Sequence, residues 1–221
     1  MAVTLKKFRD PIETQRRIMA AAKVEFAKNG LAGARVDVIA ARAKANKRMM
    51  YHYFGNKEKL FQLVLEDAYA AFREAEAALA LDSEEPIAAL RKLVTFNWAY
   101  FLANPEFITL VNSENLHKAK HIKNSKRMED MSRTFVGRMA ALLERGVATG
   151  LFRKNLDAIQ VTITIASVAY YYLTNRFTAA IVFERDMMTE AALKARLEFN
   201  VSSILHIVCT PETLRKLEDS A

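Results

Sequence analysis

Residues 47–60 of this chain read KRMMYHYFGNKEKL, and they are the most informative segment about its fold. Its first part predicts a short helix over about Lys47–Phe54, because apolar residues recur there at i, i+3 and i+4. Gly55 can then adopt the left-handed conformation that ends many helices, and Asn56 can accept a backbone N–H at the start of the next helix. The short helix therefore has two faces, an apolar one made of Met50, Tyr53 and Phe54 and a polar one made of Lys47, Arg48, Tyr51 and His52.

Two more helices are predicted before this stretch. The first runs from about Pro11 to Lys28, with proline in its first turn and Asn29-Gly30 at its end. The second covers about Val36–Ala43, and only residues 44–46 separate it from the helix that follows. Three helices of which the last two are joined by so short a turn form a helix-turn-helix arrangement.

The positive charge of the chain is concentrated in the same region. The 221 residues include 33 Lys and Arg against 25 Asp and Glu, which gives a net charge of +8. Residues 1–60 hold 14 basic and 5 acidic side chains, a net charge of +9, whereas residues 61–221 hold 19 basic and 20 acidic ones, a net charge of −1. Such an asymmetry indicates a nucleic acid or another anionic partner for the N-terminal part alone.

The polar face of the predicted helix at 47–54 carries the hydrogen-bond donors that a helix in the major groove needs. Arg35 before the second helix and Lys57 after the third can contact phosphates on either side. The alternative is a solvated basic face on an ordinary three-helix bundle, but the confinement of the excess charge to this region favours DNA binding. The predicted DNA-binding residues are Arg35, Lys44, Asn46, Lys47, Arg48, Tyr51, His52 and Lys57.

Three stretches, FAKNG at 26–30, VDVIA at 36–40 and YHYFGNKEKL at 51–60, resemble the N-terminal domain of the TetR family of bacterial transcriptional regulators. The resemblance implies a homodimeric, all-α, ligand-responsive regulator, usually a repressor. It also implies that the matched part binds DNA and that the remainder binds a ligand and dimerises. On this basis the recognition-helix contacts are Lys47, Tyr51 and His52, and Lys57 contacts a phosphate.

The chain departs from the family pattern at four positions near the DNA face. Arg35 stands where the family usually has a small hydroxyl residue, and Lys44 stands where the turn often has glycine. Arg48 and Met49 replace the small residues that follow the recognition-helix lysine. These changes add charge and bulk, so an operator sequence does not carry over by analogy.

The rest of the chain is also predicted to be helical, since 221 residues contain only 6 Gly and 4 Pro. The expected fold class is all-α, with a three-helix DNA-binding domain over residues 1–56 and a larger helical ligand-binding and dimerisation domain over residues 57–221. A long helix joins the two. The amphipathic patterns and their breaks predict helices over about 57–81, 86–103, 105–116, 125–149, 156–183 and 189–208.

The larger domain shows a second, looser resemblance. NPEF at 104–107, ENLH at 114–117 and GLFR at 150–153, together with Asn112 and His121, are similar to the TetR subgroup that includes regulators of pyrimidine and nicotinate catabolism. The likeness covers most of residues 85–205. It implies a small, polar aromatic or heterocyclic effector.

Aromatic, amide and guanidinium side chains also cluster on the predicted helices of this domain. Ligand pockets between helices are mostly apolar with a few polar groups, and Asn and Arg bind carbonyl or carboxylate edges. Taken singly, each such residue is more often part of the core or of an ion pair, so we expect some of the set to line a pocket. The predicted ligand-binding residues are Asn97, Trp98, Phe101, Asn112, Asn115, Tyr171, Asn175 and Arg176.

Residues 158–175 contain no charge over 18 positions, a length at which a membrane span must be considered. Several hydroxyl and amide side chains inside the segment favour a buried helix instead. A helix that is apolar nearly all round is expected to pack on its own bundle and on a partner subunit. We therefore expect a homodimer through the last two helices and no membrane partner.

Other classes of protein are disfavoured. Cys209 is the only cysteine, so an internal disulfide is excluded and a reducing cytoplasm is the expected location. Glu114, His117 and His121 have a spacing that can hold zinc, but the flanking lysines and the lack of further ligands argue against it, and we expect no metal and no cofactor. No common catalytic motif occurs, so no catalytic residue is predicted. The open alternatives are a nonspecific nucleic-acid-binding architectural protein and a helical small-molecule carrier or enzyme.

Overall fold

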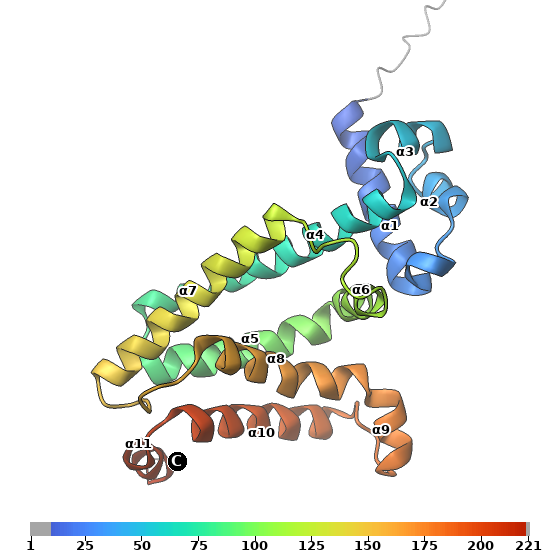
Figure 1. Ribbon diagram of the computed structural model, residues 1–221. Helices are drawn as coiled ribbons and strands as arrows, with labels where there is room; N and C mark the ends of the chain where they lie inside the picture. The colour runs from blue at the N-terminus through green and yellow to red at the C-terminus, as the bar shows by residue number, and fades with distance from the viewer. Residues whose placement is uncertain (1–9, 220–221) are drawn as a thin grey trace, which may run out of the picture. The chain divides into compact units, whose positions relative to one another are not determined.

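The computed structural model describes residues 10–219, which form eleven α-helices, one 3-10 helix and one isolated β-bridge (Figure 1). The predicted all-α class is confirmed. Residues 1–9, which carry part of the basic N-terminal charge, lie outside the described residues. The helices are α1 (Pro11–Gly33), α2 (Val36–Arg42), α3 (Lys47–Phe54), α4 (Lys57–Ala77), η1 (Leu81–Ser83), α5 (Pro86–Ala103), α6 (Pro105–Leu116), α7 (Lys126–Ala148), α8 (Ala158–Thr174), α9 (Arg176–Val182), α10 (Glu190–Val208) and α11 (Pro211–Glu218).

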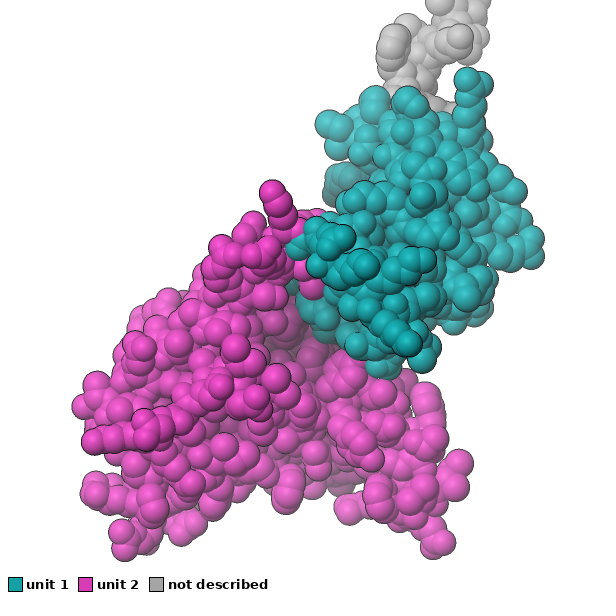
Figure 2. Space-filling view, in the orientation of Figure 1, with its two compact units in different colours: residues 1–69, 106–125 teal, residues 70–105, 126–221 magenta. Residues whose placement is uncertain are grey.

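The chain divides into two compact units, which Figure 2 colours separately. Unit 1 comprises residues 1–69 and 106–125, and unit 2 comprises residues 70–105 and 126–221. Unit 1 therefore holds α1 to α3, the first part of α4 and nearly all of α6. The predicted boundary between a DNA-binding domain (residues 1–56) and a ligand-binding domain (residues 57–221) stays a prediction. The compact units divide the chain at a different place, within α4.

The core of unit 1 forms where the apolar faces of its helices meet. Ile18 and Phe26 of α1 are fully buried, and the Phe26 ring packs edge to face on Phe61 of α4 with 5.2 Å between the ring centroids. Gly30, with φ of 64°, interrupts α1 where the sequence predicts its end, and one more turn follows to Gly33. Burial of each large apolar side chain contributes about 1.5–3 kcal/mol to this core.

The position of α6 is decided by contacts with α1 that are remote in sequence. Lys23 of α1 forms an ion pair with Glu106, with 2.9 Å between Nζ and Oε1. The backbone N–H of Leu31 donates to Ser113 Oγ at 3.3 Å. These contacts explain why nearly all of α6 belongs to the compact unit of the helix-turn-helix, although residues 70–105, which belong to unit 2, separate the two parts of unit 1 in the sequence.

The core of unit 2 is built around α5, which packs against α7, α8 and α10. Its buried apolar side chains come from all four of these helices and include Leu90, Leu93, Met139, Leu142, Ile165, Ile204 and Val208. Cys209 follows α10 and is completely buried. Burial raises the pKa of the Cys209 thiol to about 11, so the side chain is a neutral part of the core near neutral pH.

Three predicted helix boundaries differ from the structure. The predicted helix at 156–183 is two helices, because the chain bends at Asn175, whose side-chain N–H donates to the carbonyl of Tyr171 at 2.9 Å. α4 ends at Ala77 rather than near Leu81, since Ala80 adopts a left-handed φ of 51°. A further helix, α11, begins at Pro211, where the sequence predicts only the end of the preceding helix.

The apolar helix α8 is buried on one face only within a single chain. Val161, Ile165 and Leu173 are buried, whereas Ile163 is 52% and Tyr171 is 64% exposed. One face of α8 thus packs on its own bundle, and packing of the other face on a partner subunit stays a prediction. In the described part of the chain, no helix has both the length and the hydropathy needed to cross a bilayer.

Candidate DNA interface and effector pocket

The helix α3 has the two faces that its sequence predicts, with the predicted bounds Lys47–Phe54. Met50 is 1% and Phe54 is 7% exposed, so these two side chains hold the helix on the core of unit 1. Tyr51 is 48% exposed, and the other polar residues of the predicted recognition face point away from the core as well. The exposed polar residues of α3 are Lys47, Arg48, Tyr51 and His52.

Capping hydrogen bonds define both ends of α3. Asn46 precedes the helix, and its side-chain Oδ1 accepts the N–H of Met49 at 2.8 Å. Gly55 ends it with φ of 78° and donates its N–H to the carbonyl of Tyr51 at 2.9 Å. Asn56 then caps α4 by accepting the N–H of Lys59 at 2.7 Å. The helix is thus set rigidly at both ends, as a helix that reads a groove requires.

Two of the predicted phosphate contacts also have partners within the protein. Lys57 donates from Nζ to the carbonyl oxygens of Ala32 and Ala34 at 3.4 and 3.2 Å. Arg35 forms a two-point pair with Asp37, at 3.3 and 2.7 Å. The hydrogen bond between them raises the pKa of Arg35 and lowers the pKa of Asp37. Both cations therefore also order the start of α2 and the end of α1.

The three residues weighed as a metal site, Glu114, His117 and His121, lie in the last turn of α6 and in the hydrogen-bonded turns that follow it. Glu114 is 3% exposed, and its two oxygens accept the backbone N–H of His121 at 2.7 Å and contact Nδ1 of the same residue at 2.6 Å. The ring of His117 contacts the carbonyl of Ser113 through Nδ1 at 2.7 Å. Among the described residues, no group of three His, Cys, Asp or Glu has an arrangement that could hold a metal ion.

The structure does not gather the eight predicted ligand-binding residues into one unit. Asn112 and Asn115 belong to α6 and unit 1, whereas the others belong to unit 2. Trp98 is buried against Tyr172, with 5.6 Å between the ring centroids. Tyr171 is 64% exposed. The remaining four have local roles or core positions. Asn97 donates to the carbonyl of Leu93, Phe101 packs on Tyr170, and Asn175 and Arg176 lie at the bend between α8 and α9.

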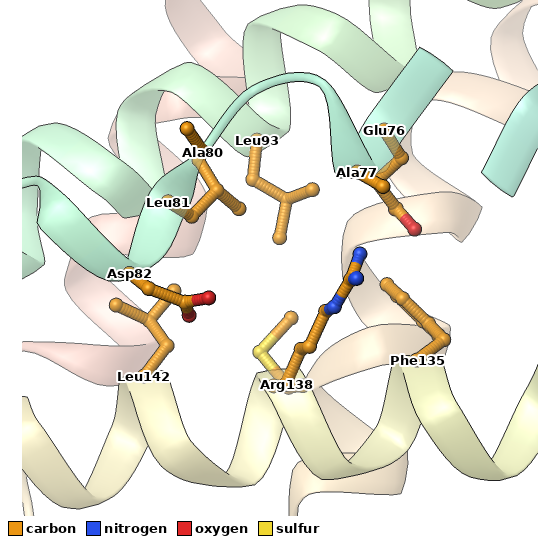
Figure 3. Close-up of a pocket in the computed structure, with 10 residues that line it drawn as sticks. Glu76, Ala77, Ala80, Leu81, Asp82, Leu93, Phe135, Arg138 and Leu142 are labelled. Carbon is orange, nitrogen blue, oxygen red and sulfur yellow. The ribbon is translucent and has the colours of Figure 1, made fainter. Parts of the chain in front are cut away.

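A pocket of about 490 Å³, part of which is open to solvent, lies in unit 2 between the end of α4, η1, α5 and α7. Figure 3 shows its lining, with Arg138 reaching from α7 into the space below Glu76. None of the eight predicted ligand-binding residues lines it. We call this space the Glu76 pocket, and its lining residues are Glu76, Ala77, Ala80, Leu81, Asp82, Leu93, Phe135, Arg138, Met139 and Leu142.

Glu76 is the unusual group of this pocket because it is a carboxylate with only 6% exposure. One oxygen, Oε2, accepts from Arg73 Nη1 at 2.8 Å. The other, Oε1, is buried without a hydrogen-bond partner among the described residues. Burial raises the pKa of Glu76, and the positive charges of Arg73 and Arg138 act in the opposite direction. The guanidinium of Arg73 also lies 3.6 Å from the ring centroid of Phe135.

A signal for Glu76 is present in the sequence but is easily missed. Val64, Ala68 and Phe72 are buried and follow one another at i, i+4 and i+8 on α4. Glu76 continues this apolar stripe by one more turn. An acidic residue at a position of the buried face is the kind of exception that marks a candidate site, because burial of a charge is unfavourable unless it has a partner.

Comparisons with known proteins agree with this organisation. Residues 18–64 match the family described as "Bacterial regulatory proteins, tetR family", and residues 86–204 match "Tetracyclin repressor-like, C-terminal domain". The chain is 41% identical over 186 residues to the HTH-type transcriptional repressor NicS of Pseudomonas putida, covering 84% of this chain and 88% of that protein. It is 36% identical over 143 residues to the HTH-type transcriptional repressor SCO4008 of Streptomyces coelicolor, covering 64% of this chain and 70% of that protein.

Solved structures show the same architecture. The putative transcriptional regulator SCO4942 of Streptomyces coelicolor superposes with a TM-score of 0.69 at 29% identity, covering 88% of this chain and 98% of that one. The ketosteroid transcriptional regulator KstR2 of Mycobacterium tuberculosis superposes with a TM-score of 0.63 at 18% identity, covering 88% and 95%, which is a likeness of fold. Together with the helix-turn-helix of unit 1, these matches show that the chain belongs to the TetR family of bacterial transcriptional regulators.

Proposed function

We propose that this protein is a transcriptional repressor that binds a palindromic operator as a homodimer and releases it when a small molecule binds. The observation that carries the proposal is the exposed polar face of α3, held on a buried Met50 and Phe54 between two capped ends. The relatives named above support the direction of control, since NicS and SCO4008 are both named as repressors. Because operator DNA lies in the bacterial cytoplasm, the protein acts there.

The proposed DNA contacts divide into two classes. Lys47, Tyr51 and His52 reach base edges or adjacent phosphates from the exposed face of α3. Arg35 and Lys57 contact phosphates and must share their donors with the internal partners described above. Lys44, Asn46 and Arg48 lie exposed beside them and complete the proposed contact surface.

The proposed dimer uses α8 and α10. Their outer faces carry large apolar side chains that a single chain leaves exposed: Ile159 at 51%, Ile163 at 52%, Phe199 at 62% and Ile207 at 41%. An isologous interface of this kind would present two copies of α3 to two half-sites of one operator. The effector binds in the helical unit 2, and its chemistry is small, polar and aromatic or heterocyclic. Relatives that are regulators support a role without catalysis.

The proposal is tested by selecting operator sequences from random DNA and measuring affinity for the selected site at increasing salt concentrations. We expect a palindromic site. Lys47→Met should lower the slope of log affinity against log salt by about one, because one phosphate-neutralising cation is lost. Tyr51→Ala should relax the preference at particular base pairs.

Lys154→Met is the matched control, since Lys154 is an exposed lysine of unit 2. It should leave both the salt slope and the base preference unchanged. Equal affinity of the native protein for the selected site and for random DNA would contradict the proposal and favour a nonspecific architectural protein.

A further inference from the structure

We propose that α9 is a docking arm for a second copy of this chain. Its exposed apolar residues enter a groove at the opposite end of α8 on the partner, and the partner's α9 enters the same groove on this copy in return. The inference rests on the homodimer of the proposed function and adds a second pair of contacts to its α8–α10 face. We call the exposed residues of the arm the α9 patch, and they are Phe177, Ile181, Val182 and Phe183.

The α9 patch is a large apolar surface for so short a helix. Its four side chains are between 64% and 79% exposed. Of the seven residues of α9, all of which the structure describes, Ala179 alone is buried. A helix of this length is not stable in water through its own hydrogen bonds, so packing must hold it in place. Because adjacent exposed apolar side chains mark surfaces that another molecule covers, the α9 patch indicates a contact that a single copy does not make.

Hydrogen bonds fix the base of the arm to the rest of unit 2. Tyr172, in the last turn of α8, donates its hydroxyl to the carbonyl of Met187 at 2.8 Å and so ties the segment after α9 back to α8. Arg196 of α10 donates from Nη2 to the carbonyl of Val168 on α8 at 2.8 Å. The α9 patch is therefore presented in one place, at the end of the α8–α10 pair (Figure 1), and a surface that is ordered beforehand loses less entropy when a partner binds it.

A groove of matching apolar character lies at the other end of α8. We call it the α7–α8 groove, and its apolar lining consists of Ala140, Leu143, Val147, Ala148, Leu156 and Ala158. Figure 1 shows α9 and the connection from α7 to α8 at opposite ends of α8. Because α8 has 17 residues, which corresponds to about 25 Å, the α9 patch of one chain does not reach the groove of the same chain.

An exposed stripe on α8 connects the groove to the patch. Its residues follow one another at intervals of four and so lie on one face along the whole helix: Ile159, Ile163, Ser167 and Tyr171. When two copies of α8 lie antiparallel about a two-fold axis, the stripes cover each other and the α9 patch of each copy meets the α7–α8 groove of the other. This direction also places the positive N-terminal end of each α8 near the negative C-terminal end of its partner. One isologous contact thus buries both patches and both grooves.

The size of the interface and the local charge favour a second copy over other partners. A stable interface buries about 800 Å² and about 20–30 residues on each side. α8 and α10 expose five large apolar side chains, and the α9 patch adds four more to the same surface. Glu184, Arg185 and Asp186, which follow the patch, carry no net positive charge, so this surface does not suit an anionic membrane.

Cross-linking between copies of the full chain tests the arrangement. In an Ile181→Cys/Ala148→Cys double variant, one cysteine lies in the α9 patch and the other at the exposed rim of the α7–α8 groove. A short bismaleimide should join the two into a covalent dimer, which denaturing electrophoresis detects. The native Cys209 is completely buried and does not compete for the reagent. Each single variant, and an Ile181→Cys/Leu116→Cys control whose second cysteine lies exposed on α6, should remain monomeric on the gel.

Two results of this experiment overturn the proposal. One is a double variant that gives no covalent dimer although sedimentation shows that it is dimeric. The other is a covalent dimer of the Ile181→Cys single variant, because it would place the two α9 helices against each other instead of against the grooves.

A charge in the α9 patch tests what the contact contributes to affinity. Ile181→Glu should raise the Kd of the dimer at least about tenfold, because it places a carboxylate in an apolar groove. Ile181 is exposed in a single copy, so the chain should keep its fold, and an unchanged circular dichroism spectrum checks this. Leu116→Glu is the control and should keep the native Kd. A native Kd for the Ile181→Glu variant overturns the proposal.

Phe199→Glu, on the α8–α10 face, separates this inference from the proposed function. If Phe199→Glu weakens the dimer and Ile181→Glu does not, the proposed homodimer stands and the α9 contact is wrong. If the native protein is monomeric when it binds its operator, the homodimer and the α9 contact are both wrong. If the native protein is dimeric but selects no operator, the proposed function fails, whereas cross-linking of the Ile181→Cys/Ala148→Cys variant still supports the α9 contact.

Discussion

Lys44, in the turn between α2 and α3, has a backbone conformation that is unfavourable for a residue with a side chain. Lys44 has φ of 50°, in the left-handed region, at the end of α2. Its N–H donates to the carbonyl of Ala41 at 3.1 Å, and the N–H of Ala45 donates to Ala40 at 2.9 Å, which is how many helices end. Glycine usually occupies such a position because a Cβ is unfavourable there. The lysine thus retains a charge near the DNA face at the cost of backbone strain.

Lys44→Gly should raise the free energy of unfolding by about 1 kcal/mol, since the left-handed conformation costs residues with a Cβ about that amount. Lys44→Ala, which keeps the strain and removes the charge, is the matched control and should stay within about 0.5 kcal/mol of the native protein. Urea denaturation measures both. Both variants lose the same charge, so they should weaken operator binding equally. A gain in the free energy of unfolding that is as large for Lys44→Ala as for Lys44→Gly would contradict the role of the backbone angle.

At the scale of elements, the two glycines of α7 have opposite surroundings. A Cβ built on Gly146 would overlap the ring of Phe152, which is 2% exposed and donates its N–H to the carbonyl of Gly146 at 3.0 Å. A Cβ built on Gly137 meets no atom of another part of residues 10–219 within 4 Å. The first glycine therefore permits the chain to fold back after α7, whereas the second is not required by any contact within the described part of the chain.

Gly137→Ala should stabilise the protein by about 1 kcal/mol, the difference in helix propensity between the two residues. Gly146→Ala should destabilise it by about 1–3 kcal/mol, because the Phe152 ring must leave its buried position. The two substitutions are the same chemical change on one helix, so each is the control for the other. Thermal or urea unfolding that ranks them in the opposite order would contradict the packing of Phe152 on α7.

At the scale of the whole molecule, the unburied apolar surface of α8 and α10 indicates that one chain is not the complete assembly. Phe199 and Ile163 are both more than half exposed, and such side chains gathered on adjacent helices mark protein interfaces. A dimer also accounts for the sequence of α8, which is apolar on faces that its own unit does not cover.

Phe199→Glu should weaken the dimer by at least about tenfold, because it places a charge in an apolar interface. Sedimentation equilibrium measures this change, and operator affinity should fall with it. Leu116→Glu is the matched control: Leu116 is 84% exposed on α6, outside the proposed interface. A Phe199→Glu protein that remains as dimeric as the control would contradict the interface, and a variant with native thermal stability excludes misfolding as the cause.

Local signals predict much of the fold. The bounds of α3 are confirmed to the residue, because Asn46 and Gly55 cap it through bonds within a few residues of each other. Pro86 and Pro105 likewise begin α5 and α6 close to where they are predicted. The break at Asn175 was not predicted, because the side chain that caps α8 can also lie inside a helix, and only the packing around it decides between the two.

The all-α class, the helix-turn-helix and the polar face of α3 can all be predicted from the amino-acid sequence, since each depends on periodicity and caps within one or two helical turns. The tertiary structure alone decided that α6 packs with the N-terminal helices, and that Glu76, Phe135 and Arg138 meet in one pocket. The physical reason is that these contacts join residues far apart in the chain. Ser113 and Leu31, or Glu76 and Arg138, have no common periodic pattern, and only the packing of whole helices brings them together.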